Sequence, residues 1–403
     1  MNDEGKTILY VGGFELPDKN AAAQRCVANA KIFRDLGYKV VLLGVSKTQQ
    51  KAIEREEYFG FDCWSIPYPK STRAWLKHIT SLDQVNYLFE KEYSNQVAAV
   101  VCYNHPAISQ YRIKRLAHQH KALALADVTE WYSVSGSKLA QKIVKWLDTS
   151  LRMYLLNFMM DGLITTSDYL SRFYQKKTIV ELPTLYDKSQ LHDFIPVNSS
   201  SRNAIPELIY AGSPFDVAQA ERDRSAVKER LDLIIESLFG ASSQGINFHL
   251  SIFGVTREDY LRVYPEHSET LDELKQKIKF KGRCTHSVIL DNIAKSDFSI
   301  FLRDINRVTL AGFPSKFAES VTLGTPVITN PISNLTSYAV EGKNCFYVDI
   351  DDKDARIKSL ILILSSTHED ISDAKEYCRI TDTFDYRAFK QCVGNFLNQL
   401  FQK

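Results

Sequence analysis

Two basic side chains and one carboxylate lie close together in the sequence and could bind an anionic ligand that also carries hydroxyl groups. Lys316 and Glu319 are three residues apart in GFPSKFAESVTLG, and Arg303 precedes them. The start of a helix attracts phosphate because its free N–H groups and its dipole are positive. A carboxylate one turn later can accept hydrogen bonds from hydroxyl groups. These residue types favour a ligand that contains both phosphate and hydroxyl groups.

The elements that must position these residues are a strand, a loop, a helix and a second strand. In DFSIFL, Phe298, Ile300 and Leu302 alternate on one face. Arg303 therefore falls at the carboxyl end of a strand, where open α/β sheets bind ligands. Pro314 suits the first position of a helix because it lacks the N–H that would have no partner there. We expect the helix to begin near Pro314 and to end at the glycine before TPVIT, the next strand.

The expected helix has a buried stripe and a charged neighbouring face. Phe313, Phe317 and Val321 recur at positions i, i+4 and i+8, which places Lys316 and Glu319 together beside the stripe. For charges at this spacing alone, a solvated ion pair is the more frequent arrangement. The alternative is that the pair binds a nucleotide sugar, which offers phosphate to the helix start and hydroxyls to the carboxylate.

Length and composition indicate a two-domain protein that acts on small molecules. The chain has 403 residues, of which 44% are hydrophobic, so it can fill two cores of ordinary size. Its 50 basic and 48 acidic side chains leave a net charge of +2, which does not favour nucleic acid. The seven cysteines are scattered without metal-ligand spacing, so we expect reduced, mostly buried thiols and no metal site.

The hydropathy of the chain predicts a cytoplasmic protein. No apolar run reaches the roughly 18 residues needed to cross a bilayer, and the N-terminal residues are polar. The most apolar segment, residues 151–163, is interrupted at helical intervals by Arg152, Asn157 and Asp161, as in a packed amphipathic helix. Peripheral contact with the inner face of the membrane is the alternative for this segment.

The first half of the chain is typical of a parallel doubly wound sheet. Residues 7–11 form an apolar strand that ends at Gly12-Gly13, a helix follows over 21–37, and residues 39–45 form the next strand. The full G-x-G-x-x-G spacing is missing, so we do not expect a nicotinamide cofactor. The glycine pair either lets a backbone approach a ligand or forms a plain tight turn. Further strands are expected at residues 98–102, 123–126, 162–165 and 178–182.

Polar residues follow several of these strands, at the edge where a substrate is expected. His105 precedes a proline in one such loop, and Asp127 and Glu130 follow the strand at 123–126. A lone histidine in a loop is more often structural than catalytic, but His105 remains a candidate. Asp127 and Glu130 are further candidates, although Glu130 could also cap the following turn.

The second half predicts another sheet after a linker. Beyond Pro183 the sequence loses its periodicity and gathers Ser, Asn and Pro. The strands ELIYAG, HLSIFG, IKFKG, DFSIFL and PVIT follow, with helices between them. We divide the chain into Rossmann-like domains at 1–198 and 199–380, and expect the helix of residues 381–403 to pack back toward the first. Lys228, before the helix LDLIIESLF, could meet a phosphate, although a solvated charge run is the more frequent case.

Taken together, these features resemble a known enzyme family. Two Rossmann-like domains, a glycine pair after the first strand, AGSP at the start of the second domain and FKGR before a helix resemble a GT-B glycosyltransferase, specifically family GT4. GFPSKFAESVTLGTPVI is similar to the family's donor-site helix, written E-x7-E followed by A-x-x-x-G-x-P-V-I. Glu319 matches the second glutamate, whereas the first falls at Ala311. The resemblance implies two domains that face each other across a cleft.

The resemblance also implies roles for individual donor-site residues. Glu319 would hold the ribose hydroxyls of a nucleotide sugar. Arg303, Lys316 and Lys228 would stabilise the diphosphate as catalytic groups, with Arg230 as the rival of Lys228. The other donor-binding residues implied are Gly12, Gly13, Gly212, Gly282, Arg283, Gly312, Phe313, Pro314 and Ser315. Many family members have a histidine after the strand that ends here at residue 126, and this chain has DVTE instead, so His105, Asp127 and Glu130 are the acceptor-side candidates.

The function implied is a retaining hexosyltransferase that moves a sugar from a nucleotide-sugar donor to a glycan or lipid-linked acceptor in bacterial surface polysaccharide synthesis. Positive groups aimed at the leaving diphosphate lower the barrier, so no metal cofactor is required. Ala311 and the missing histidine also fit an alternative, a non-catalytic GT-B subunit that stabilises a glycosyltransferase partner. A nucleotide-sugar epimerase would need acid and base groups around the sugar, and no convincing set is evident.

Overall fold

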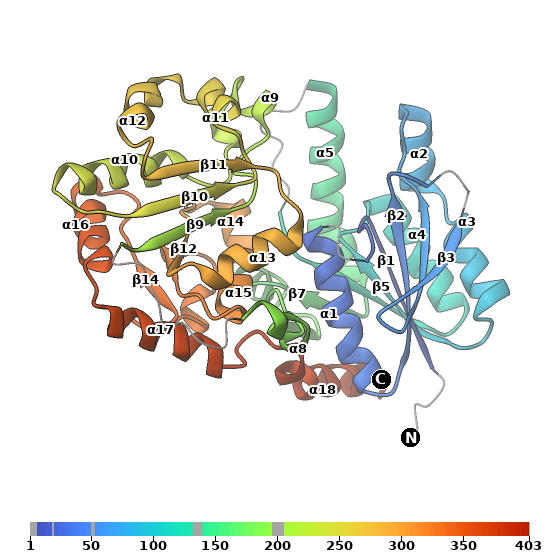
Figure 1. Cartoon of the computed structure of the whole chain (residues 1–403). Coiled ribbons are helices and arrows are strands. Elements are labelled where there is room, and N and C mark those ends of the chain that lie inside the picture. The colour runs from blue at the N-terminus through green and yellow to red at the C-terminus, as the bar shows by residue number, and fades with distance from the viewer. Residues whose placement is uncertain (1–5, 18–19, 50–52, 132–138, 196–204, 403) are drawn as a thin grey trace.

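The chain forms two α/β domains, each built on its own sheet (Figure 1). The computed structural model describes residues 6–17, 20–49, 53–131, 139–195 and 205–402. Figure 1 shows the first domain on the right and the second on the left, with α1 (Ala21–Asp35) between the two sheets. The predicted architecture of two doubly wound, largely parallel domains is confirmed.

The first sheet has eight strands in the order β3-β4-β2-β1-β5-β6-β7-β8. Neighbouring strands are parallel except β3 and β4, which form an antiparallel hairpin at one edge. The central strands are apolar on both faces because helices cover both, so a core cluster lies on each side of the sheet. The strands are β1 (Thr7–Gly12), β2 (Lys39–Ser46), β3 (Glu54–Tyr58), β4 (Phe61–Pro67), β5 (Val97–Tyr103), β6 (Leu123–Val128), β7 (Gly162–Thr165) and β8 (Ile179–Glu181).

Helix α1 of the first domain begins and ends as its capping residues predict. The Asn20 side chain accepts a hydrogen bond from the Ala23 N–H at 2.9 Å and starts α1, and Gly37 follows its end with φ +97°. The other helices are α2 (Thr72–Thr80), α3 (Asp83–Tyr87), α4 (Ala107–Gln119), α5 (Leu139–Leu151), α6 (Asn157–Met159) and α7 (Asp168–Phe173), with turns η1 (Leu88–Glu92) and η2 (Arg152–Leu156).

The second sheet has six parallel strands in the order β11-β10-β9-β12-β13-β14, around one core cluster. Its strands are β9 (Glu207–Ala211), β10 (His249–Phe253), β11 (Ile278–Gly282), β12 (Phe298–Ile300), β13 (Val327–Thr329) and β14 (Cys345–Tyr347). Its helices are α9 (Val217–Ala220), α10 (Leu231–Ser243), α11 (Arg257–Val263), α12 (Ser268–Glu273), α13 (His286–Lys295), α14 (Arg307–Ala311), α15 (Ser315–Thr322), α16 (Lys353–Leu364) and α17 (His368–Ile380), with turns η4 (Arg224–Ala226), η5 (Pro265–His267) and η6 (Leu335–Ser337).

The chain ends on the first domain. After η7 (Tyr386–Phe389), α18 (Lys390–Phe401) places Phe396 and Leu400 in a core cluster of that domain. A Cβ at Gly162 of β7 would lie 2.7 Å from Leu400, so the helix packs directly on the strand. The linker contains α8 (Lys188–Leu191) and η3 (His192–Phe194), whereas the predicted boundary at residues 198 and 199 lies outside the described residues.

Several local predictions differ from the structure. The β3–β4 hairpin and β14 are present although no strand is predicted there. α14 occupies part of the expected loop after Arg303, and Pro314 is the N-cap of α15 rather than its first residue. All seven cysteines are free and five are buried. None of the described helices combines the length and apolar composition needed to cross a bilayer.

Candidate functional site

A buried cluster of charged side chains lies beside the second sheet. Arg303 Nη2 donates a hydrogen bond to Glu229 Oε1 at 2.6 Å, and Arg303 Nε donates to the same oxygen at 3.2 Å. Lys316 Nζ donates to Glu229 Oε2, and the Tyr210 hydroxyl donates to that oxygen at 2.5 Å. Arg303 and Glu229 are only 5% and 2% exposed. Glu229 is therefore the centre of the cluster, with a cation on each carboxylate oxygen.

Backbone contacts fix the members of this cluster. The Arg303 N–H donates to the Asn330 side chain at 3.0 Å, and the Asn330 amide donates back to the Arg303 carbonyl at 3.0 Å. Glu229 directly precedes α10, where the Arg230 N–H donates to the Leu302 carbonyl at 2.8 Å. Lys316 extends from the first turn of α15. The end of β12, the start of α10 and the start of α15 thus converge.

The cluster carries more positive than negative charge. Burial alone would raise the pKa of Glu229, but Lys316 and Arg303 hold its pKa well below the usual range, so it is ionised. Burial and the neighbouring charges of Arg303 and Lys228 lower the pKa of Lys316, although Glu229 opposes this shift. Lys228 is exposed at the edge of the cluster, and the charge of Arg303 is the main cause that lowers its pKa. Three cations share one carboxylate, so a bound anion would relieve their repulsion.

Two glycines make room for Lys316. Gly212, which follows β9, has a φ of +133°, and a Cβ there would lie 2.6 Å from Lys316 Nζ. Gly254, which follows β10, has a φ of +100°, and a Cβ there would lie 2.5 Å from the Gly212 backbone. Both conformations favour glycine because a side chain would be strained. The ends of β9 and β10 are therefore shaped for close packing against the lysine.

Glu319 lies on the same helix as Lys316 but contacts a second group of side chains. His286 Nε2 lies 3.0 Å from Glu319 Oε1, and the Tyr186 hydroxyl donates to the same oxygen at 3.4 Å. Gln24 Nε2, from α1 of the first domain, lies 3.2 Å from His286 Nε2. A cavity of about 490 Å³ adjoins this contact and is lined by α1, the segment 185–194 and α13. The carboxylate therefore sits at the boundary between the domains.

The first domain presents a carboxylate to the cation cluster. The charge of Glu130 opposes the lowering of the Lys228 pKa, so this carboxylate acts on Lys228 electrostatically across the domain boundary. Next to it, the Asn104 side-chain amide donates to Thr129 Oγ1 at 2.5 Å, and the Thr129 N–H donates back to Asn104 at 3.2 Å. These contacts hold the loop after β6 against the loop after β5.

The glycine pair after β1 has two different environments. A Cβ at Gly12 would lie 2.8 Å from the Tyr103 Cβ, so packing between β1 and β5 requires a glycine there. A Cβ at Gly13 would meet nothing within 4 Å, and the residue is exposed. Gly13 thus leaves its backbone open, as expected of a ligand-facing turn, whereas Gly12 is explained by packing.

Comparison with known families finds a match for the second domain. Residues 223–379 match the family model of Glycosyl transferases group 1. The chain contains a group 1 glycosyltransferase domain. The cation cluster, with Glu229 and Lys316, lies within the matched residues. A search of curated protein sequences finds no match to the chain.

Solved structures share the fold of this chain over nearly its whole length. The catalytic domain of starch synthase IV from Arabidopsis thaliana, bound to ADP and acarbose, has a TM-score of 0.71 at 9% identity and covers 99% of this chain and 100% of that chain. Sucrose-phosphate synthase from Thermosynechococcus elongatus has a TM-score of 0.68 at 14% identity, covering 98% and 99%. Anabaena Alr3699/HepE, in complex with UDP and glucose, has a TM-score of 0.62 at 12% identity, covering 98% and 100%. The predicted GT-B fold is confirmed.

The structure brings part of the predicted donor site together. Lys316 lies against Gly212, and the charges of Arg303 and Lys228 are near enough to lower its pKa. Arg283, next to Gly282 (φ +64°), lines a separate cavity of about 290 Å³ with residues of the loops after β9 and β10.

The other donor-site candidates have mixed environments. Phe313 is a core residue whose ring centroid lies 5.5 Å from that of Tyr338. Pro314 is buried at the start of α15, and Ser315, the first residue of the helix, is half-buried. A Cβ at Gly312 would lie 3.7 Å from the Thr129 carbonyl, so this glycine adjoins the first domain.

Ala311 is part of a contact between the two domains. It is fully buried in a core cluster of the first domain, and its carbonyl accepts a hydrogen bond from Ser167 Oγ at 2.8 Å. Ser167 also caps α7, which explains its position at the start of that helix. The position where the family has its first motif glutamate is therefore occupied by an interdomain packing residue.

Burial corrects one acceptor-side prediction, Asp127. Asp127 is fully buried, where it pairs with Arg25 at 2.8 Å and accepts from the Tyr10 hydroxyl at 2.5 Å. It stabilises α1 against the sheet and cannot face a substrate. His105 is half-buried, and loss of hydration, with smaller effects from His78 and Arg152, lowers its pKa to about 3, so its role stays a prediction. Glu130 is the predicted acceptor-side residue that lies near the cation cluster.

The sequence patterns missed Glu229, Tyr210 and His286. Glu229 lies within the charged run next to Lys228, and only the basic residues of that run were predicted to bind phosphate. Tyr210 lies in the apolar strand β9, so the sequence predicts a core residue there. His286 follows FKGRCT at the start of α13, and its position after a strand was the available signal.

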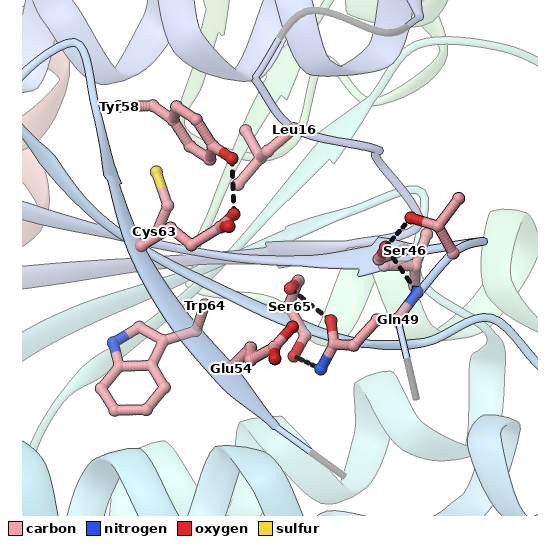
Figure 2. Close-up of a pocket in the computed structure, with 11 residues that line it drawn as sticks. Leu16, Ser46, Gln49, Glu54, Tyr58, Cys63, Trp64 and Ser65 are labelled. Atoms are coloured by element: carbon pink, nitrogen blue, oxygen red, sulfur yellow. Dashed lines mark hydrogen bonds between the residues drawn. The ribbon is translucent and has the colours of Figure 1, made fainter. Parts of the chain in front are cut away.

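A separate pocket of about 310 Å³ lies on the first domain beside β2, β3 and β4 (Figure 2). Figure 2 shows that its polar side chains pair with one another. The Tyr58 hydroxyl donates to Glu56 at 2.5 Å, and Ser65 and Gln49 exchange hydrogen bonds. None of the cation-cluster residues lines it.

Proposed function

We propose that the protein is a retaining, metal-independent glycosyltransferase that moves a sugar from a nucleotide-sugar donor to a glycan or lipid-linked acceptor. The group 1 domain and the GT-B fold support the reaction class. The cation cluster around Glu229 is the observation that carries the proposal. Synthesis of a bacterial surface polysaccharide is the pathway we infer for it.

The cluster has the charge that such a reaction needs. Breaking the bond between sugar and diphosphate builds negative charge on the leaving phosphate, and fixed cations stabilise that charge without reorganisation. Arg303, Lys316 and Lys228 supply three positive charges, of which Glu229 cancels one. The diphosphate would then displace Glu229 as the partner of these cations. In this arrangement the protein supplies the electrostatic stabilisation that a metal ion supplies elsewhere.

The acceptor would approach from the first domain. Glu130 is the carboxylate that lies near the cluster on that side, and the exposed Gly13 leaves an open backbone at the end of β1. In a retaining transfer with no enzyme nucleophile, the leaving phosphate takes the acceptor proton. The role of the first domain is then to orient the acceptor hydroxyl, which itself contributes much of the rate enhancement.

The test is a screen of nucleotide sugars by thermal shift, followed by a transfer assay. A donor that binds the folded state at a concentration of 100 times its Kd stabilises the protein by about 2.7 kcal/mol, a clear rise in Tm. With that donor, we expect release of a nucleoside diphosphate that depends on acceptor, persists in EDTA, and yields a product of unchanged anomeric configuration. An inverted product or a chelator-sensitive rate would overturn the respective part of the proposal.

A second candidate is a non-catalytic GT-B subunit that stabilises a glycosyltransferase partner. The burial of Ala311 against Ser167 favours it, because a packing contact replaces a position that touches the transferred sugar in the family. The two candidates predict different results in the same screen. A subunit of this kind would show no Tm shift with any nucleotide sugar and would co-purify with an active partner.

A further inference from the structure

Large apolar side chains are exposed along one helix of the first domain. Val144, Leu147, Leu151 and Leu155 follow one another at spacings of three and four residues on α5 and η2, and they are 43%, 54%, 42% and 50% exposed. The opposite face, with Thr149, Arg152, Met153 and Leu156, is buried. A surface helix normally turns polar residues outward, so this apolar outer stripe lacks a partner within the described structure.

A second helix of the first domain, α2, also exposes apolar side chains. Trp75 and Leu76 of α2 are exposed, as are Ile143 and Trp146 of α5. Both helices contact α4, and Figure 1 shows that they extend in the same direction beyond the sheet. We call these side chains, together with the α5 stripe, the apolar face of the first domain.

The apolar face is bordered by positive charge. Residues 70–80, KSTRAWLKHIT, and 137–147, SKLAQKIVKWL, each contain three basic residues and no Asp or Glu. The net charge of the whole chain is only +2, so the rest of the chain is net negative. Arg73, Lys77 and Lys145 are exposed. Exposed positive charge thus lies on both helices that expose the apolar side chains.

We propose that the apolar face binds the surface of an anionic lipid bilayer. Tryptophan and leucine can enter the boundary of the acyl chains while lysine and arginine reach the lipid phosphates, which is the composition of interfacial helices. Protein interfaces, in contrast, are depleted of lysine. The interleaved lysines and apolar residues therefore favour a membrane over a second protein.

The apolar face leads toward the domain boundary. The Tyr154 ring, on η2, lies 5.4 Å from the ring of Trp131, and the Arg307 guanidinium of the second domain lies 4.6 Å from that Trp131 ring. Trp131 directly follows Glu130 in the chain. If the proposed transferase function holds, a lipid-linked acceptor in the bilayer would therefore lie beside the site. Binding to the bilayer itself does not depend on that function.

The experiment is vesicle co-sedimentation of the full-length protein without any nucleotide sugar. We expect binding to vesicles of phosphatidylcholine with 30% phosphatidylglycerol, weaker binding to phosphatidylcholine alone, and release as salt is raised from about 50 to 500 mM. The double variant L147E/L151E should lower the partition coefficient by about tenfold or more per substitution. Lys77→Glu with Lys145→Glu should weaken binding to the anionic vesicles by about 30-fold and leave binding to neutral vesicles unchanged.

The matched controls are on the second domain. Leu362 on α16 is 74% exposed and Lys358 on the same helix is exposed, so L362E and K358E should bind as the parent does. All variants should keep the parent far-UV spectrum and Tm, because the changed residues are exposed. The proposal is overturned if the parent ignores anionic vesicles, or if L147E/L151E binds as tightly as the parent. It is equally overturned if sedimentation velocity shows a dimer that the same double variant dissociates. A thermal shift with nucleotide sugars, measured separately, reports on the donor site alone.

Discussion

Replacing Lys316 with methionine tests whether the cation cluster serves catalysis. The variant keeps the length of the side chain and its packing against Gly212, but it removes the charge that pairs with Glu229. Glu229 keeps its hydrogen bonds from Arg303 and Tyr210, so the carboxylate is not left unpaired. The loss of one hydrogen bond to a charged group should lower the free energy of unfolding by about 1.5–3 kcal/mol, which a domain of this size tolerates.

The effect on transfer should be larger than a loss of binding alone. One preorganised donor aimed at developing charge contributes about 3 kcal/mol, which is on the order of a hundredfold in rate. Because the negative charge on the diphosphate grows as the sugar bond breaks, kcat should fall more than KM rises. We expect K316M to lose on the order of a hundredfold in kcat with a change of only a few-fold in KM.

Arginine at position 316 should not restore the rate. The tip of Lys316 fills the space left by the missing Cβ of Gly212, where a Cβ would lie 2.6 Å from Nζ. The larger guanidinium has no room there, so K316R should resemble K316M although it keeps the charge.

The assay is steady-state release of nucleoside diphosphate with the donor found in the thermal shift screen. The control is K358M, which removes an exposed lysine from α16 of the same domain and should leave both constants unchanged. A folded K316M protein that transfers sugar within about twofold of the parent would refute the assignment of the cluster to catalysis.

Three further predictions concern charged side chains of the cluster and of the first-domain core. The pKa values of Lys316 and Lys228 are lowered from 10.5, so both lysines lose their charge at a lower pH than usual. Donor affinity measured by calorimetry should therefore fall as the pH rises toward 10. An affinity that does not change with pH would contradict this prediction. Glu229→Gln leaves two cations without a carboxylate and should cost about 3–5 kcal/mol of stability in denaturant melts, with a larger Tm rise on adding a nucleoside diphosphate than in the parent. Asp127→Asn should lower the free energy of unfolding by a similar amount, because it leaves the buried charge of Arg25 without a counter-charge. The Kd for the donor should stay unchanged. A higher Kd would show that Asp127 belongs to the donor site.

The sheet strands were largely readable from the sequence because most are buried on both faces. Continuous apolar runs located β1, β5 and β7 to within about a residue. Strand β3 was not predicted because EREEY is an edge strand whose middle residues are exposed on both sides. Its sequence therefore shows no alternation of apolar and polar residues. β14 has three residues, too few for a periodic pattern.

Only part of the candidate site could be predicted from the sequence, for a different physical reason. Arg303 and Lys316 could be placed because each sits at a predictable end of a strand or helix. Their partner Glu229 is 74 and 87 residues away from them in the sequence, and only the folded sheet brings it between them. The prediction that Asp127 faces the acceptor was wrong for the same reason. Its partner Arg25 is 102 residues away in the sequence, and the two side chains form an ion pair in the core rather than at the edge of the sheet.

The buried carboxylate at the centre of the cluster explains how the site can discriminate between ligands. Three cations with no counter-charge would bind any anion, including inorganic phosphate, and would strain the fold through mutual repulsion. Glu229 cancels one of the three charges, so two remain, which matches a sugar-linked diphosphate with one charge on each phosphate group. When the sugar leaves, the diphosphate gains a further negative charge, and the electrostatic attraction rises at that step. A carboxylate among phosphate-binding cations thus weakens ground-state binding while it preserves the stabilisation of the leaving group, which is the difference that accelerates a reaction.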